Sequence, residues 1–271
     1  MPKANAFLDK LKNKWKEKKF VCVGLDKGNF EFDEQSSSSN KSIIDQTQDL
    51  VCAYKLNSAF YEVEGTAGLE SLKKTVDYIH QKDPQMPVIL DAKKGDIGNT
   101  NEAYAKATFD DLGADAITVH PYLGKESLQP FLQRADKGIF VLVKTSNPGA
   151  GEFQDLEVYD PERSRGVEGK PLYQIVAEHV AGWGKNVAVV VGATYPEDLK
   201  KIREIVGDLP ILIPGVGAQG GDIKSLKNGL NSQGDGIIVS SSRGIIFADN
   251  PREATLKLIN QIKLILADLS S

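Results

Sequence analysis

Eight short apolar segments recur along the chain, and their order and spacing limit the folds that it can adopt. The segments are 20–25, 51–56, 87–90, 115–119, 138–143, 187–191, 210–213 and 236–239. They are rich in Val, Ile and Leu and show no polar–apolar alternation, as expected of parallel strands covered on both faces. Helix-like stretches lie between most of them, at 72–80, 100–112, 172–183, 197–206 and 252–266. Eight strand–helix alternations over about 250 residues predict an α/β fold of the (β/α)8 TIM barrel type.

The alternative α/β architecture is a doubly wound open sheet. Its nucleotide-binding members carry G-x-G-x-x-G after the first strand, and no such motif follows residues 20–25. Nothing in the composition marks a linker, so we expect residues 1–271 to form a single barrel domain.

The first residues of the chain predict an additional helix. Phe7, Leu11 and Trp15 recur every four residues and share one helix face, so residues 1–19 are expected to supply an N-terminal helix that packs on the barrel. Elsewhere, helix N-caps are expected at Ser71, Asp222 and Asn250.

Net charge and cysteine content limit the classes of binding partner and the cellular compartment that we expect. The net charge of −4 and the isoelectric point near 5.5 argue against nucleic acid or an anionic membrane as the main partner. No apolar stretch suits a membrane helix and no signal sequence opens the chain, so a cytoplasmic protein is expected. Cys22 and Cys52 fall in strands with their side chains on opposite sides, which predicts two inert free thiols in a reducing environment.

Charged residues gather where the first three apolar segments end. Asp26 follows the first segment and Lys55 the second, while the third runs into Asp91-Ala92-Lys93-Lys94-Gly95-Asp96. Asp91 and Lys93 have the same parity on a strand and are expected to point to one side. Because catalysis in TIM barrels takes place at the carboxyl ends of the strands, these residues predict an active site. The alternative is a solvated charged turn.

The interleaving of carboxylates and lysines indicates the kind of chemistry. A metal site is disfavoured because the ammonium groups neutralise the carboxylates and repel a cation. A Schiff-base lysine needs surroundings that favour its neutral form, whereas carboxylates favour the charged form. A protonated lysine beside a carboxylate is suited to donating a proton to a carbanion.

Two further strand ends predict a phosphate site. The seventh segment runs into Pro214-Gly215-Val216-Gly217-Ala218-Gln219-Gly220-Gly221, and the eighth into Ser240-Ser241-Ser242-Arg243-Gly244. In TIM barrels a phosphate is often held by the loops after strands seven and eight. Exposed backbone N–H groups can hold the anion and Arg243 can add a charge-assisted contact. Tight turns without a ligand are the alternative for either loop alone.

With these motifs in hand, the chain resembles the orotidine 5′-phosphate decarboxylase family, in its longer, largely bacterial-type group. The resemblance covers nearly the whole chain and is carried by the sequences that begin at Asp91, Lys144, Pro214 and Ser241. One departure is Leu56, where proline is expected after Lys55, and it affects only the expected shape of the local loop.

The resemblance implies roles for individual residues. It places the catalytic array at Lys55, Asp91, Lys93 and Asp96, and substrate binding at Asp26, Ile97, Thr100, Ser146, Gln219, Ser242 and Arg243. Asp96, Ile97 and Thr100 would reach in from the partner subunit of a homodimer with shared sites. Ser146 would read the pyrimidine amide, Asp26 the ribose, and Gln219 with Arg243 the phosphate.

The same resemblance implies decarboxylation of orotidine 5′-monophosphate to uridine 5′-monophosphate without metal or organic cofactor. Lys93 would stabilise and protonate the carbanion at C6. The nearest rivals are magnesium-dependent sugar-phosphate decarboxylases or aldolases of the same barrel group, which carry a carboxylate where Lys55 stands here. A noncatalytic nucleotide-binding barrel is the third possibility, but it would not need Asp91 and Lys93.

Several residues near the expected site are left without a role. His80 and His179 fall in helical stretches and are expected to be surface or packing residues. His120 ends the fourth segment, and we assign no function to it. The long loop 146–170 could cover the pocket or lie on the surface, and the sequence does not distinguish these.

Overall fold

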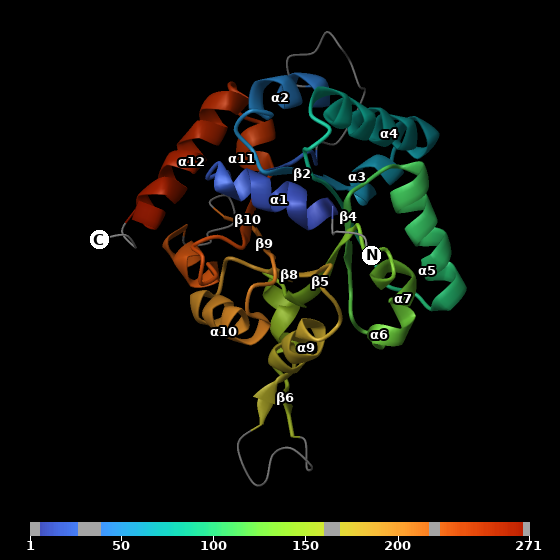
Figure 1. Cartoon of the computed structure of the whole chain (residues 1–271), viewed down its shortest axis with the longest axis vertical. Coiled ribbons are helices and arrows are strands. Elements are labelled where there is room, and N and C mark those ends of the chain that lie inside the picture. The colour runs from blue at the N-terminus through green and yellow to red at the C-terminus, as the bar shows by residue number, and fades with distance from the viewer. Residues whose placement is uncertain (1–5, 27–38, 160–168, 217–222, 268–271) are drawn as a thin grey trace.

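The computed structural model describes residues 6–26, 39–159, 169–216 and 223–267. Eight parallel strands form a closed barrel, as the sequence predicted, and helices surround it (Figure 1). Around the barrel the strands are β1 (Val21–Gly24), β2 (Ala53–Asn57), β3 (Val88–Lys94), β4 (Ala116–Val119), β5 (Gly138–Lys144), β8 (Val187–Val191), β9 (Ile211–Pro214) and β10 (Ile237–Ser241). Each of the eight expected segments contributes one strand.

Helices lie on the outside of the barrel, between successive strands or after the last one (Figure 1). They are α2 (Asn40–Thr47), α3 (Ser58–Glu62), α4 (Gly65–Lys82), α5 (Gly98–Ala105), α6 (Gly124–Ser127), α7 (Gln129–Leu132), α8 (Gly151–Gln154), α9 (Leu172–Ala181), α10 (Pro196–Val206), α11 (Arg243–Ile246) and α12 (Pro251–Ala267). Shorter helical turns are the π-helical η1 (Lys106–Asp111) and the 3-10 helices η2 (Pro148–Ala150) and η3 (Ile223–Gly229). The helix expected at 100–112 is therefore divided between α5 and η1.

The predicted helix caps have different outcomes. Asn250 caps α12, because its side-chain oxygen accepts a hydrogen bond of 3.1 Å from the backbone N–H of Glu253. The prediction for Ser71 is wrong: α4 begins at Gly65, six residues earlier, where the backbone is left-handed (φ 61°), and Ser71 is buried inside the helix. Asp222 lies outside the described residues.

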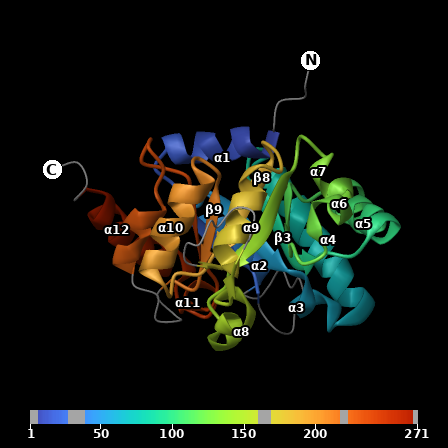
Figure 2. The ribbon, with the colours of Figure 1, turned by 90° about the horizontal axis from the view of Figure 1, so that it is seen from below.

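The expected N-terminal helix is α1 (Ala6–Lys16), and it lies across the base of the barrel (Figure 2). The rings of Phe7 and Phe140 of β5 pack edge to face, with 5.6 Å between the ring centres. The Trp15 indole N–H donates to the carbonyl of Ile237, the first residue of β10, at 2.9 Å. Ion pairs of 2.7 Å join Lys10 to Asp115 and Lys14 to Asp83. These partners lie at the amino ends of the strands, opposite the predicted active site.

Two short strands lie outside the barrel. Strand β6 (Glu157–Val158) pairs antiparallel with β7 (Lys170–Pro171), and this ribbon projects from the barrel beside α9 (Figure 1). It belongs to the long loop after β5, of which residues 160–168 are outside the described part.

Two other expectations concern the cysteines and membrane segments. Cys22 and Cys52 are buried and free, and burial raises the pKa of Cys22 to about 12, which keeps this thiol unreactive. Among the described helices, none has both the length and the apolar character that a bilayer crossing requires.

Candidate active site

A cavity of about 180 Å³ opens at the carboxyl ends of five strands. The residues that line it are Asp26, Lys55, Asn57, Asp91, Pro214, Gly215, Val216, Ser240, Ser241, Ser242 and Arg243. They come from the ends of β1, β2, β3, β9 and β10, or directly follow them. The structure therefore brings both groups of strand ends, the charged one and the Gly/Ser/Arg one, to one cavity.

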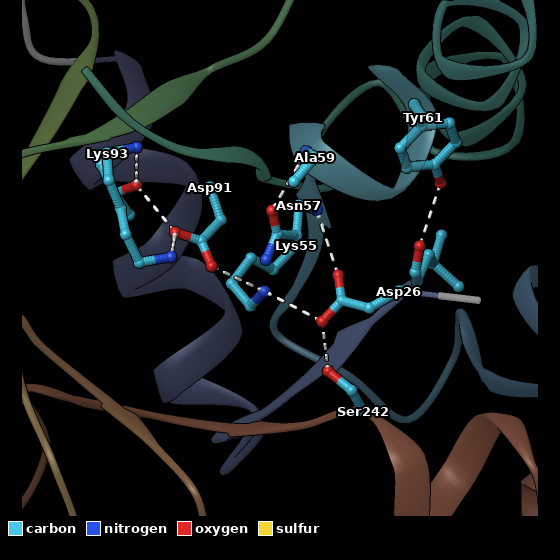
Figure 3. Close-up of polar contacts among 10 residues, drawn as sticks. Asp26, Lys55, Asn57, Ala59, Tyr61, Asp91, Lys93 and Ser242 are labelled. Carbon is cyan, nitrogen blue, oxygen red and sulfur yellow. Dashed lines mark hydrogen bonds and ion pairs between the residues drawn. The ribbon is translucent and has the colours of Figure 1, made fainter. Parts of the chain in front are cut away.

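Lys55 lies at the centre of the charged group. Its side chain is 6% exposed, and its Nζ lies 3.2 Å from Asp26 Oδ2 and 3.0 Å from Asp91 Oδ2 (Figure 3). The barrel register produces this arrangement, since Gly24 pairs with Lys55 and Asn57 with Asp91. A buried ammonium group is thus neutralised by carboxylates from the two neighbouring strands.

Asp91 joins Lys55 to Lys93. Its other oxygen, Oδ1, accepts hydrogen bonds of 2.7 Å from Lys93 Nζ and 2.8 Å from the hydroxyl of Thr118 on β4. The Thr118 hydroxyl also accepts the backbone N–H of Lys93 at 3.0 Å. Lys93 itself is left-handed, with φ 47°, and the register of β3 shifts between Leu90 and Lys94. The two charged side chains meet as expected, but through a bulge rather than regular strand parity.

The charges set the ionisation of the array. Burial would raise the pKa of Asp91, but the positive charges of Lys55 and Lys93 lower it to about 2. Burial would lower the pKa of Lys55, and the carboxylates of Asp91 and Asp26 reverse this and raise it. Asp91 and Lys55 are therefore ionised at neutral pH, so the array presents fixed charges.

Asp26 connects the charged array to the phosphate side. Its Oδ1 accepts the backbone N–H of Asn57 at 3.0 Å, and its Oδ2 accepts the hydroxyl of Ser242 at 2.7 Å (Figure 3). A side chain at Gly24 would collide with the Ser242 hydroxyl, so glycine is needed for this close approach.

Sequence reasoning had not given Asn57 or Thr118 a role. Polar residues at the ends of otherwise apolar strands were the available signal.

The phosphate side is described in part. Arg243 is the first residue of α11 and is exposed at the cavity, while Gly215 (φ 85°) turns the chain after β9. Gln219 lies outside the described residues.

Five of the described predicted site residues are not in the lining of this cavity: Lys93, Asp96, Ile97, Thr100 and Ser146. Lys93 still joins the charged array through Asp91. Asp96, Ile97 and Thr100 are exposed beyond β3. The Asp96 carboxylate accepts the backbone N–H of Ile97 at 2.7 Å. Ser146 follows β5 and packs on Gly192, where a Cβ would lie 2.8 Å from its own Cβ.

None of the three histidines is in the lining of the cavity. His80 bonds Asp115 at 2.9 Å near the base of the barrel, and His179 is exposed on α9, as expected. The His120 ring covers Gly95, where a Cβ would collide with it. Across the described ranges, no three His, Cys, Asp or Glu side chains are grouped so that they could hold a metal ion.

Comparison with known proteins gives this arrangement a family. The model of the orotidine 5′-phosphate decarboxylase / HUMPS family matches residues 19–258. The chain belongs to this family. Orotidine 5′-phosphate decarboxylases from Thermomicrobium roseum and Cellvibrio japonicus are 49% and 44% identical to it. The first alignment covers 84% of this chain and 82% of its relative, and the second 90% and 91%.

Solved structures of orotidine 5′-phosphate decarboxylases share the barrel. The structure of Leishmania donovani OMP decarboxylase superposes with a TM-score of 0.85 at 38% identity, covering 96% of this chain and 98% of that one. The similar sequences and the similar solved structure are therefore both named orotidine 5′-phosphate or OMP decarboxylase. In the chain itself Lys55 lines the cavity.

Proposed function

We propose that this protein decarboxylates orotidine 5′-monophosphate to uridine 5′-monophosphate, a step of pyrimidine biosynthesis in the cytoplasm. The observation that carries the proposal is one cavity that joins the array of Asp26, Lys55 and Asp91 to Ser242 and Arg243. Such a cavity suits a ligand with a reacting group at one end and a phosphate at the other. The relatives of known name support this choice of ligand.

Lys93 is the proposed proton donor. Loss of carbon dioxide leaves an electron pair at C6 of the pyrimidine, and an ammonium group at that carbon stabilises the developing charge and then supplies the proton. Lys93 fits this role because its side chain is 49% exposed while its Nζ is hydrogen-bonded to the carboxylate of Asp91. It can therefore reach a ligand and remain oriented.

Asp91 and Lys55 serve the reaction through fixed charge. Asp91 would face the substrate carboxylate, and repulsion between them raises the ground state by at most about 1–5 kcal/mol. The larger contribution is expected from the preorganised lysines, which favour the transition state without rearrangement during the reaction. Lys55 holds both carboxylates in place.

Binding of the remaining parts of the nucleotide is assigned to other strand ends. Arg243, Ser242 and Gln219 would hold the phosphate, Asp26 the ribose, and Ser146 the pyrimidine amide. The phosphate is remote from C6, so its binding energy is available to orient the reacting group.

We further propose a homodimer with shared active sites. Asp96, Ile97 and Thr100 are exposed in one chain and would complete the cavity of the partner. The same end of the molecule exposes several large apolar side chains, as expected of a surface that another chain covers. They are Phe60, Val63, Leu69, Ile97, Tyr122 and Leu123.

The proposed reaction is tested by the loss of orotidine 5′-monophosphate absorbance with purified protein. We expect turnover that survives exhaustive chelation of divalent ions. A parallel assay with 3-keto-gulonate 6-phosphate addresses the sugar-phosphate rival. Turnover of that compound with magnesium, and none of the nucleotide, would overturn the proposal. Tight nucleotide binding without any reaction would identify a noncatalytic barrel instead.

A further inference from the structure

Lys144 is a buried lysine that the proposed reaction does not use. It is the last residue of β5, its side chain is 2% exposed, and it is absent from the lining of the cavity. The ammonium group points toward α9 and α10, with Nζ 5.0 Å from the ring centre of Tyr173 and 5.2 Å from that of Tyr195. A lysine in such a place needs compensation for the loss of water.

Two carboxylates from different segments provide that compensation. Lys144 Nζ donates a hydrogen bond to Asp155, directly after α8, and lies 3.8 Å from Asp198 Oδ2 in the first turn of α10. The Tyr173 hydroxyl donates to the other oxygen of Asp198 at 3.0 Å. One ammonium group therefore joins the end of β5 to α8, α9 and α10.

The next residue binds the same returning segment. Thr145 donates its backbone N–H to Gln154 Oε1 at 2.9 Å, and Gln154 Nε2 donates to the Thr145 hydroxyl at 2.8 Å. Lys144 and Thr145 thus hold Gln154 and Asp155 through consecutive contacts. Ser146 is the next residue, so its backbone continues from a segment that these contacts hold in place.

Close packing restricts Ser146 on its other side. A Cβ at Gly192 would lie 2.8 Å from both the backbone nitrogen and the Cβ of Ser146. The backbone N–H of Gly192 also donates to the carbonyl of Lys144 at 2.8 Å. The position of Ser146 therefore depends on the tether at Lys144 together with this contact.

We propose that Lys144 is a positioning residue for Ser146. By tying the loop after β5 to α8 and α10, it holds the serine where the pyrimidine is recognised, without touching the ligand itself. The inference rests on the role of Ser146 in the proposed function. It gives the buried ammonium group of Lys144, on the outer side of the barrel, a role in binding the pyrimidine.

The substitution Lys144→Met tests this positioning role. Methionine has a similar length, and the carboxylate left behind at Asp155 is 52% exposed and can be hydrated, so the fold is expected to survive. Inhibition by uridine 5′-monophosphate should weaken about fivefold to tenfold, the worth of one or two neutral hydrogen bonds. Inhibition by ribose 5-phosphate should not change, because that ligand lacks the pyrimidine.

Lys201→Met is the matched control, since Lys201 is 51% exposed on α10 and pairs only with Glu204 among the described ion pairs. It should leave both inhibition constants unchanged. A cycle with Ser146→Ala adds a second readout: the effect of Lys144→Met should largely vanish when Ser146 is already absent. Additive effects, equal weakening of both inhibitors, or no weakening at all would each overturn the inference.

Amide hydrogen exchange separates this inference from the proposed reaction. Exchange across residues 146–156 should be faster in Lys144→Met than in the wild type, whatever the substrate of the enzyme is. If the wild type does not decarboxylate the nucleotide, the proposed function fails. The exchange measurement by itself then shows whether Lys144 holds the loop after β5. Unchanged exchange in that segment would show that Lys144 does not hold the loop.

Discussion

Asp91 illustrates how much depends on one carboxylate. Its two oxygens contact different lysines, Lys55 and Lys93, and Thr118 fixes its orientation from the neighbouring strand. The lysines more than offset the effect of burial and lower the pKa of Asp91 to about 2. The ion pairs of the proposed catalytic array therefore also contribute to the free energy of unfolding.

The first prediction concerns acid. The pKa of Asp91 is lower in the folded state than its unfolded value of about 3.8, so its stabilising contribution is present above pH 4 and is lost as the pH falls toward 2. The wild type should therefore lose about 1 kcal/mol more unfolding free energy than Asp91→Asn between pH 5 and pH 3. Urea unfolding at the two pH values measures the difference. Equal losses would mean that the ion pairs do not depress this pKa.

The second prediction concerns the proton donor. Lys93→Ala should lower turnover at least about 1,000-fold, because both the charge at C6 and the proton source are removed. Inhibition by uridine 5′-monophosphate should persist, since the phosphate contacts remain. Lys94→Ala is the control: the adjacent ammonium group lies 4.4 Å from the Tyr104 ring centre, away from the cavity. Comparable losses in both variants would contradict a specific role for Lys93.

At the scale of elements, α1 and the barrel strands show where sequence reasoning succeeds. Uniformly apolar runs identified all eight strands, because parallel strands covered on both faces need such runs. The spacing of Phe7, Leu11 and Trp15 located α1 because a single apolar stripe must face the barrel. Both are properties that neighbouring residues determine locally.

Other features depend on contacts between distant segments, so the sequence alone did not predict them. The bulge at Lys93 is held by the Thr118 hydroxyl on the adjacent strand. The proposed site shows the same division. Strand-end charges indicated the residues that line the cavity, while the contact between Ser242 and Asp26 joins residues 216 positions apart.

The third prediction belongs to α1. Phe7→Ala should lower the unfolding free energy by about 3 kcal/mol, because it removes a buried ring that packs on Phe140 and over Gly138. The ratio kcat/KM should stay unchanged, since the helix lies at the opposite end from the cavity. Lys12→Ala, on the exposed face of α1, should alter neither quantity. A large loss of kcat/KM in folded Phe7→Ala protein would contradict this separation.

At the scale of the whole molecule, the two ends of the barrel differ in character. The base is covered by α1, whereas the opposite end carries the cavity, the exposed Asp96 and a group of exposed apolar side chains. A two-fold dimer formed through that end would exchange residues between sites, because each chain would supply what its partner lacks.

The fourth prediction tests this exchange. Mixing inactive Lys93→Ala with inactive Asp96→Ala should restore about a quarter of wild-type activity, since half of the dimers are mixed and each mixed dimer has one intact site. Activity after subunit exchange measures it. No recovery in samples shown to have exchanged would indicate that Asp96 acts within its own chain.

The position of α1 at the amino ends of the strands limits where ligands can enter and leave the barrel. With the strand interior filled by side chains and α1 closing the amino ends, the proposed reaction has its passage on the carboxyl side. Carbon dioxide and the nucleotide product of the proposed reaction would then share one exit, and carbon dioxide, which carries no phosphate to hold it, would leave first. In the proposed reaction, release of the phosphorylated product would then be the slower of the two and would set an upper limit on turnover.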